Sequence, residues 1–304
     1  MTLVSVLSPC YNSASTLNRF LDRVTKALAL VDLDHEVLLV DDGSSDGTWN
    51  LIKERSASDS RIRGIRLTRN FGQHPAILAG LRAARGSVVV LIDSDLDDDP
   101  LHIPLLLEPL LDGTADIALT TTTRLRKTRS TSRLLHRLAQ KSTGSPLVED
   151  IGTFRAMTSP VVTALVQYQD HSSVYGPLST QIGFRQVIIE IPDSESPNSP
   201  STYTLKKRVR LAWPMLLNEI GMPVKVTVIV AVVMFGLVST LGATAMWRFV
   251  SGGGDPTSTT SLVFLVLLLN QVLLGLGITM VAFYARGILR EVLGRPRYHI
   301  WEEV

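Results

Sequence analysis

The stretch "VVVLIDSDLDDDP", Val88 to Pro100, places five apolar residues directly before five aspartates that fall within seven positions. An unbroken apolar run of this length is typical of a strand that is buried on both faces of a parallel sheet. Aspartates this close together repel one another, and charged side chains are rarely left without a partner. The stretch therefore predicts a buried strand that ends at a site for a positively charged partner.

Similar apolar runs alternate with amphipathic segments along the N-terminal part of the chain. We expect strands at 3–7, 36–40, 62–67, 88–92 and 117–120, and helices at 15–30, 48–56, 76–84 and 103–111. The repeated strand–helix order predicts an α/β fold, with a Rossmann-like, mainly parallel sheet and helices on both faces. Because ligands of such sheets bind at the carboxyl ends of the strands, the polar residues that follow each strand are the candidate site residues.

The composition limits the classes of protein that need to be considered. The chain has 304 residues, of which 45% are hydrophobic, and its formal net charge is +2. A charge this close to neutral gives no reason to expect a nucleic-acid partner. Cys10 is the only cysteine, so no internal disulfide can form. The first residues lack the basic segment and the long apolar run of a signal peptide, so we expect the domain that follows to stay in the cytoplasm.

Two uncharged segments towards the C-terminal end, 226–247 and 257–285, are long enough to cross a membrane as helices, and we expect the spans at about 224–247 and 260–285. The connector between them is short and rich in turn-forming residues, and Arg248 is its only basic residue. The basic residues before the pair are Lys206, Lys207, Arg208, Arg210 and Lys225, and those after it are Arg286, Arg290, Arg295 and Arg297. By the positive-inside rule, this pattern predicts a multi-pass protein of the inner (plasma) membrane with its N-terminal domain and both termini in the cytoplasm.

These features divide the chain into four parts. We expect a cytoplasmic domain at 1–202, an amphipathic interface helix at 203–221, the two transmembrane helices within 222–286, and a cytoplasmic tail at 287–304. The interface helix is inferred from basic and apolar residues that alternate at helical spacing beside a span. Asn270 and Gln271 fall within the second span, where they either bond to a neighbouring helix or are simply tolerated. We favour the first interpretation, which predicts a homo-oligomer.

Four motifs of the N-terminal domain resemble, in the same order, those of the family-2 glycosyltransferases with the GT-A fold. They are "LSPCYNSASTL", "VLLVDDGSSDGTW", "RNFGQHPAILAGLRAARGSVVVLIDSDLDDDP" and "EDIGTFRAM". The resemblance spans residues 3–210 and is nearest to the branch that loads a sugar onto a polyprenyl phosphate, such as dolichol-phosphate mannose synthases and bacterial enzymes that use undecaprenyl phosphate. It implies a GT-A domain followed by the C-terminal two-helix transmembrane hairpin of the bacterial members.

The resemblance assigns the donor, a nucleotide diphosphate sugar, to the ends of the first strands. Pro9, Tyr11 and one of Asp41 or Asp42 would hold the base and the ribose, and Gln73 belongs to a signature on the donor side. Without the resemblance, the stretch around the two aspartates is also compatible with a plain acidic turn before a helix. Its combination with the aspartates of a neighbouring strand end favours a binding site.

Asp93 and Asp95 match the Asp-x-Asp motif that in this family binds a divalent ion and the donor diphosphate. The chemistry agrees, because two carboxylates and a diphosphate repel one another unless a hard cation such as Mg²⁺ or Mn²⁺ lies between them. Strand alternation would point both carboxylates the same way, with Ser94 opposite. The stretch 97–99 is interpreted mainly as turn and helix-start residues. Asp97 stands where the family often has Gln, which suggests an altered metal affinity or donor preference.

Asp150, in "VEDIGTFRAM", takes the position usually assigned to the catalytic base. A phosphate monoester has a second pKa near ~6, so the acceptor is mostly dianionic at neutral pH. Asp150 would therefore orient the acceptor or tune its charge rather than remove a proton. Arg155 would either contact the acceptor phosphate or pair with Asp150 or Glu149, and the residues leave both interpretations open.

A run of basic residues follows the fifth expected strand and would receive the acceptor phosphate. Such a run is usually a solvated loop, but this one follows a strand at the edge where the site is expected. The resemblance assigns Arg124 and Arg133 to the phosphates. Thr202 stands where the family usually has a lysine, and Lys206 and Lys207 are the candidates to supply the lost charge.

The resemblance therefore predicts an inverting, metal-dependent enzyme that transfers a sugar from a nucleotide diphosphate sugar to polyprenyl (undecaprenyl) phosphate for cell-envelope glycan modification. It would use Mg²⁺ or Mn²⁺ and contact membrane lipids. One alternative is a family-2 transferase with another membrane acceptor, a glycolipid or a polysaccharide. Another is a non-catalytic membrane scaffold, against which the intact Asp93, Asp95 and Asp150 argue. The motifs do not indicate which sugar or nucleotide base is used.

Overall fold

The computed structural model describes residues 3–122, 152–167, 183–192, 222–251, 256–294 and 296–304. The chain divides into two compact units, the first comprising 1–140, 145–202 and 296–304 and the second comprising 141–144 and 203–295. Several predicted features lie outside the described residues, namely the interface helix and the site residues Arg124, Arg133, Glu149, Asp150, Thr202, Lys206 and Lys207.

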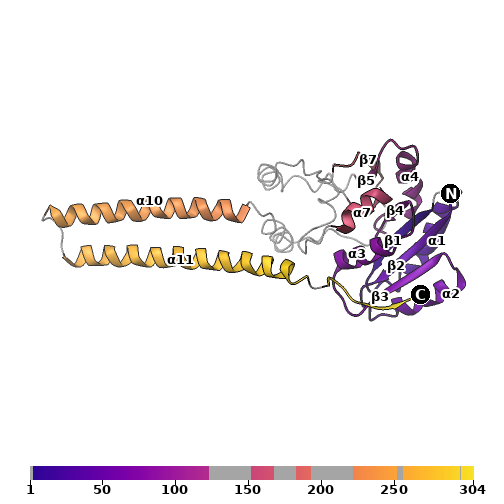
Figure 1. The fold of residues 1–304 in the computed structure, drawn as a ribbon, viewed down its shortest axis with the longest axis horizontal. Coiled ribbons are helices and arrows are strands. Elements are labelled where there is room, and N and C mark those ends of the chain that lie inside the picture. The colour runs from indigo at the N-terminus through magenta and orange to yellow at the C-terminus, as the bar shows by residue number, and fades with distance from the viewer. Residues whose placement is uncertain (1–2, 123–151, 168–182, 193–221, 252–255, 295) are drawn as a thin grey trace. The chain divides into compact units, whose positions relative to one another are not determined.

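The first unit contains one eight-stranded sheet (Figure 1). The strands are β1 (Val4–Cys10), β2 (His35–Asp41), β3 (Ile62–Leu67), β4 (Val88–Leu91), β5 (Ile117–Thr122), β6 (Arg155–Thr158), β7 (Gln186–Ile191) and β8 (Ile300–Glu303). Their order is β7-β5-β6-β4-β1-β2-β3-β8. The four strands β4, β1, β2 and β3 are parallel, as are β5 and β7, whereas β6 and β8 run antiparallel to their neighbours. The predicted mainly parallel sheet is confirmed.

Helices cover both faces of this sheet, as predicted. They are α1 (Leu17–Leu28), α2 (Thr48–Ser58), α3 (Gln73–Ala83), α4 (Ile103–Leu111), which follows a short 3₁₀ turn at Pro100–His102, and α7 (Ser159–Gln167). Along β2, Val37 and Leu39 pack into the core with α1, α2 and α4, whereas Leu38 and Val40 pack into the core with α3 and α7. Because side chains of a strand alternate between faces, a strand covered on both sides has an apolar middle, as β2 does at residues 37–40.

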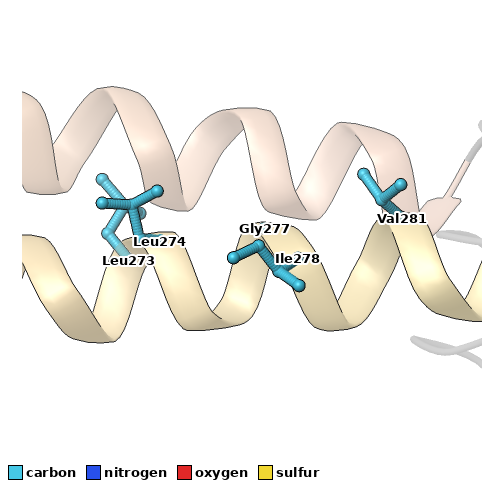
Figure 2. A pocket seen from close by; sticks show the side chains of 5 residues that line it. All are labelled: Leu273, Leu274, Gly277, Ile278 and Val281. Carbon is cyan, nitrogen blue, oxygen red and sulfur yellow. The ribbon is translucent and has the colours of Figure 1, made fainter.

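The second unit contains two long helices that pack against each other, α10 (Met222–Val250) and α11 (Pro256–Val292). Within them, Val230–Arg248 and Val263–Leu289 are long and apolar enough to cross a membrane. Large apolar side chains such as Phe235 and Phe264 are exposed on these helices, which suits contact with lipid. A shallow apolar hollow on α11 is lined by Leu273, Leu274, Gly277, Ile278 and Val281 (Figure 2).

The sheet is completed by a strand that follows both long helices in the sequence. Residues 296–304 belong to the first unit, and β8 pairs with the edge strand β3. Val304 lies so close to Gly64 of β3 that each backbone N–H donates to the other residue's carbonyl oxygen, at 2.9 and 2.8 Å. The sequence predicted only a tail here, so the pairing of β8 is a finding of the structure.

Gly64→Ala is expected to lower the melting temperature of the protein, with a loss of stability of about 1–3 kcal/mol from overpacking. A Cβ at Gly64 would lie 2.4 Å from Cγ2 of Ile52 and 3.0 Å from both Cζ3 of Trp49 and Cγ2 of Val304. Ile52 and Trp49 are buried and cannot move aside freely. Thermal unfolding of the full chain in detergent, followed by circular dichroism, measures the change. An unchanged melting temperature would contradict the close packing of α2 and Val304 on β3.

Candidate functional site

The loops that follow β1 and β2 are bound to each other at the carboxyl edge of the sheet. The Asn12 N–H donates to Ser44 Oγ at 2.9 Å, and the Ser13 N–H donates to Thr48 Oγ1 at 2.9 Å. Asn12 has a φ of 52°, a left-handed conformation that asparagine adopts more readily than most residues. The two stretches that the resemblance assigned to the donor are therefore joined by hydrogen bonds at this edge.

Asp42 shapes the loop that follows β3. Its two carboxylate oxygens accept the backbone N–H groups of Phe71 and Gly72, at 2.7 and 2.8 Å. Burial raises the pKa of Asp42, and these two hydrogen bonds oppose the rise. The neighbouring Gly43 has a φ of 69°, and a Cβ there would lie 2.5 Å from the carbonyl carbon of Arg69. The loops after β2 and β3 are thus in direct backbone contact.

Asp41 is fully buried at the end of β2, and its Oδ2 has no hydrogen bond among the described residues. Its Oδ1 accepts the Ser44 N–H at 3.1 Å, and its Oδ2 lies 3.4 Å from Nε of Arg66. Burial raises the pKa of Asp41, while the bonds from Ser44 and the charge of Arg66 oppose the rise. A buried carboxylate oxygen without a hydrogen bond is costly, so a ligand that donates one would be stabilised there. Of the two candidates Asp41 and Asp42, only Asp41 has a carboxylate oxygen that accepts no hydrogen bond among the described residues.

Tyr11 is available for a flat ligand beside this carboxylate. It follows the last residue of β1, its exposed fraction is 52%, and Cys10 before it is the register partner of Asp41. Pro9 precedes them on the same strand and is partly buried. Burial raises the pKa of the Cys10 thiol to about 12, so this cysteine stays protonated and is no nucleophile. An exposed aromatic ring at this edge can stack on a base.

Asp93 and Asp95 lie beyond the end of β4, in a turn that also contains three further aspartates at positions 97–99. Gln73, the first residue of α3, donates from Nε2 to Asp93 Oδ1 at 2.7 Å. Burial and the charge of Asp95 raise the pKa of Asp93 to about 6. Burial and the charges of Asp93, Asp95 and Asp97 raise the pKa of Asp98 to about 6 as well. These carboxylates crowd one another in the way that a bound cation would relieve.

The turn that holds the aspartates differs from the predicted geometry in one respect. Because β4 ends at Leu91, strand alternation does not reach Asp93 and Asp95. Ser94 nevertheless points toward β1 and the loop after it, because its hydroxyl donates to the Pro9 carbonyl oxygen at 3.4 Å and lies 3.0 Å from Ser13 Oγ. Asp95 Oδ1 accepts the Asp97 N–H at 3.0 Å, which closes the turn.

Asp99 acts as a structural residue. Its Oδ1 accepts the Leu101 N–H at 3.0 Å and caps the 3₁₀ turn, in agreement with the helix-start interpretation. Both of its oxygens also bind Arg23 on α1, with 2.8 Å between Oδ1 and Nε. Arg23 lowers the pKa of Asp99 against the opposing effect of burial. Asp99 therefore joins α1 to this turn and is not free to bind a metal.

Arg155 lies buried on β6, close to the aspartates. Its guanidinium donates to the carbonyl oxygens of Gly152 and Thr153, at 2.8 and 3.1 Å. Burial lowers the pKa of Arg155 to about 10, and the charge of Asp93 opposes the shift. Its contact with the acceptor phosphate stays a prediction, since the positions of its predicted alternative partners are not described. Burial and the charges of Arg155 and Arg297 lower the pKa of His74, which favours the neutral form of its imidazole.

Comparison with known proteins agrees with these features. Residues 5–164 match Glycosyl transferase family 2. The undecaprenyl-phosphate 4-deoxy-4-formamido-L-arabinose transferase of Aeromonas hydrophila subsp. hydrophila is 30% identical over 99% of this chain and 94% of its own length. The protein of the same name from Shewanella sediminis is 28% identical over 98% of this chain and 91% of its own length.

Among solved structures, glucosyl-3-phosphoglycerate synthase from Mycobacterium tuberculosis, in complex with Mn²⁺ and uridine-diphosphate-glucose, aligns with a TM-score of 0.50. It is 22% identical, and the alignment covers 73% of this chain and 80% of that one. At this identity the likeness concerns the fold, which is of the GT-A type. With its family match over more than half of its length and a 30% identical relative along nearly all of it, the chain belongs to glycosyl transferase family 2.

Proposed function

We propose that this chain transfers a sugar from a nucleotide diphosphate sugar to undecaprenyl phosphate, with inversion at the anomeric carbon. The observation that carries the proposal is the meeting of Asp41, Tyr11, Asp93 and Asp95 at one edge of the sheet, in a chain whose relatives along its whole length are named for this acceptor. The sugar named for those relatives, 4-deoxy-4-formamido-L-arabinose, is the first donor sugar to test.

The donor would lie across the ends of β1, β2 and β4. A base N–H or a ribose O–H would donate to Asp41 Oδ2, the buried oxygen that has no hydrogen bond among the described residues. Tyr11 would stack on the base, and Pro9 would shape the wall beside it. Asp42 would act indirectly, because both of its oxygens hold the loop that presents Gln73 to Asp93.

Asp93 and Asp95 would hold Mg²⁺ or Mn²⁺ together with the donor diphosphate. No group of three or more His, Cys, Asp or Glu side chains suited to a metal occurs among the described residues. A pair of carboxylates still fits, since Mg²⁺ is commonly bound by one or two carboxylates plus substrate phosphates. When bound, the ion would neutralise the diphosphate as the bond to the sugar breaks. Gln73 would orient Asp93 by its hydrogen bond.

The acceptor phosphate would attack the anomeric carbon in line with the leaving diphosphate. Its dianion needs no base, so Asp150 would orient it, and Arg124, Arg133, Lys206 and Lys207 would offset its charge. Arg155 would support this side by fixing the carbonyl groups of residues 152 and 153. Catalysis would then rest on positioning two anions against each other.

The two long helices would anchor the enzyme in the inner membrane, where its lipid acceptor resides. The first unit contains both the strands that precede the helices and β8, which follows them. Two crossings return the chain to the side from which it came, which supports a position of the catalytic domain and both flanks of the hairpin on one side of the membrane. The basic residues on both flanks support the cytoplasmic side.

The test is a transfer assay with the full chain in detergent. Labelled nucleotide diphosphate sugars, including the formamido-arabinose donor, are mixed with undecaprenyl phosphate and Mg²⁺ or Mn²⁺, and the lipid phase is extracted. We expect a labelled lipid whose anomeric configuration, determined by NMR, is opposite to that of the donor, and we expect EDTA to abolish it. Product formation with a glycolipid or polysaccharide alone would favour the alternative acceptor. No product from any donor would favour the scaffold hypothesis.

A further inference from the structure

The segment that follows the membrane helices returns to the donor side of the catalytic domain. In addition to the paired backbone groups of Gly64 and Val304, the Thr68 N–H donates to the His299 carbonyl oxygen at 2.9 Å. The His299 ring lies 6.3 Å, centroid to centroid, from that of Phe71, in the loop that Asp42 holds. Backbone hydrogen bonds therefore fix the strand at both ends, and the contact between the His299 and Phe71 rings adds to them at one end. None of these contacts involves the side chain of Glu302.

Glu302, in the middle of this strand, binds a buried tryptophan near the donor site. The indole N–H of Trp49 on α2 donates to Glu302 Oε2 at 2.8 Å, across 253 residues of sequence. Glu302 is also the register partner of Arg66 on β3, so the two side chains share one face of the sheet. The Arg66 guanidinium carbon lies 6.0 Å from the centroid of the Trp49 ring, within range of a cation–π contact.

Arg66 connects this group to the carboxylate that faces the nucleotide in the proposed function. Its Nε lies 3.4 Å from Asp41 Oδ2. A continuous series of contacts thus runs from Glu302 through Trp49 and Arg66 to Asp41. Arg66 is the only residue of this series whose positive charge offsets the negative charge of the buried Asp41. The position of Arg66 therefore decides how well the Asp41 carboxylate accepts a hydrogen bond.

We propose that Glu302 is a positioning residue for donor binding, which holds Trp49 and thereby keeps Arg66 against Asp41. The inference rests on the proposed function, in which Asp41 binds the nucleotide. It adds that the segment after the membrane helices forms part of the support of the donor site. Glu302 does not touch the donor, so its loss should weaken nucleotide binding and leave the chemical step nearly unchanged.

Three variants separate the hydrogen bond from the charge. Glu302→Ala removes the acceptor and Trp49→Phe removes the donor, and each should raise the donor KM and the Kd for the nucleoside diphosphate about fivefold to tenfold, with kcat within about twofold. Glu302→Gln keeps an oxygen that can accept the indole N–H, so its Kd should stay within about twofold of the parent value. The double variant Trp49→Phe/Glu302→Ala should be no weaker than either single variant, because both remove the same bond.

Glu303→Ala is the matched control. Glu303 is adjacent on β8 and pairs with Ile65, so its side chain points to the opposite face of the sheet. It should bind nucleotide like the parent. The melting temperature of each variant is measured in parallel, to show that β8 remains paired.

The measurement is calorimetric titration of the full chain in detergent with UDP, GDP, CDP and ADP in the presence of Mn²⁺, continued with the tightest binder. Parent-like binding by Glu302→Ala and Trp49→Phe would overturn the inference while leaving the proposed function intact. Equal weakening by Glu303→Ala would also overturn it, because strand loss rather than the Glu302 contact would then be the cause. If the parent chain binds none of the four, the proposed function itself fails.

Discussion

Asp95→Asn is expected to lower sugar transfer by about a hundredfold to a thousandfold, the largest loss from any single change of charge in the site. A bound cation contributes several kcal/mol of charge stabilisation at a phosphoryl group, and each 1.4 kcal/mol is a factor of ten in rate. The substitution removes one of the two proposed metal carboxylates. It spares the turn, because the amide oxygen of asparagine can still accept the Asp97 N–H that Asp95 Oδ1 now binds. The initial rate of labelled lipid formation measures the effect.

The control for this prediction is the same chemical change at an exposed position of α1, Asp22→Asn, which should retain the parent rate. Metal removal gives a second comparison. EDTA should reduce the parent to about the level of Asp95→Asn and should reduce that variant little further. If Asp95→Asn transferred sugar as fast as the parent at limiting Mn²⁺, Asp95 would not be a metal ligand.

Gly43→Ala is expected to reduce transfer to about 1% or less of the parent rate, through loss of the donor site. Alanine at a φ of 69° is disfavoured by about 1–2 kcal/mol, and its Cβ would lie 2.5 Å from the carbonyl carbon of Arg69 and 2.7 Å from the nitrogen of Asn70. These are backbone atoms, so no side-chain rotation can relieve the contact. The loop after β3 must move away, and with it the N–H groups that Asp42 holds. Nucleotide binding and transfer are both measured.

Gly47 supplies the matched control four residues further on. Its φ is 90°, and nothing lies within 4 Å of a Cβ built there. Gly47→Ala therefore incurs the conformational cost without the collision, and its loss of activity should be much smaller than that of Gly43→Ala. Equal losses of activity would mean that the close backbone contact between the loops after β2 and β3 does not affect activity.

The sequence predicted those strands of the sheet that have a clear local hydrophobic pattern and missed those that do not. The strands from β1 to β5 were expected within a few residues, because most of their side chains are buried and their runs are mainly apolar. The strands β6, β7 and β8 were missed. β6 has only four residues and includes Arg155, and β7 and β8 carry partly exposed or charged positions typical of strands near a sheet edge. Such segments become strands through their neighbours in space.

The site shows the same division. Asp93 and Asp95 were predicted as site residues from the apolar run before them and from motif order. The different hydrogen-bond partners of Asp41 and Asp42 were not predicted, because they depend on which backbone groups lie nearby. Glu302 left no local signal, since its partner Trp49 is remote in the sequence and becomes its neighbour only when β8 pairs with β3.

The position of β8 has a consequence for biosynthesis. Until residues 300–303 leave the ribosome, β3 is an open edge strand, with unpaired backbone groups that invite association with other chains. Those residues emerge only after both long helices have been made, so the catalytic sheet acquires its last strand after the hairpin is available for insertion. Completion of the sheet therefore waits for the synthesis of both long helices. A chain that stalls before the second helix would carry an unfinished and aggregation-prone domain.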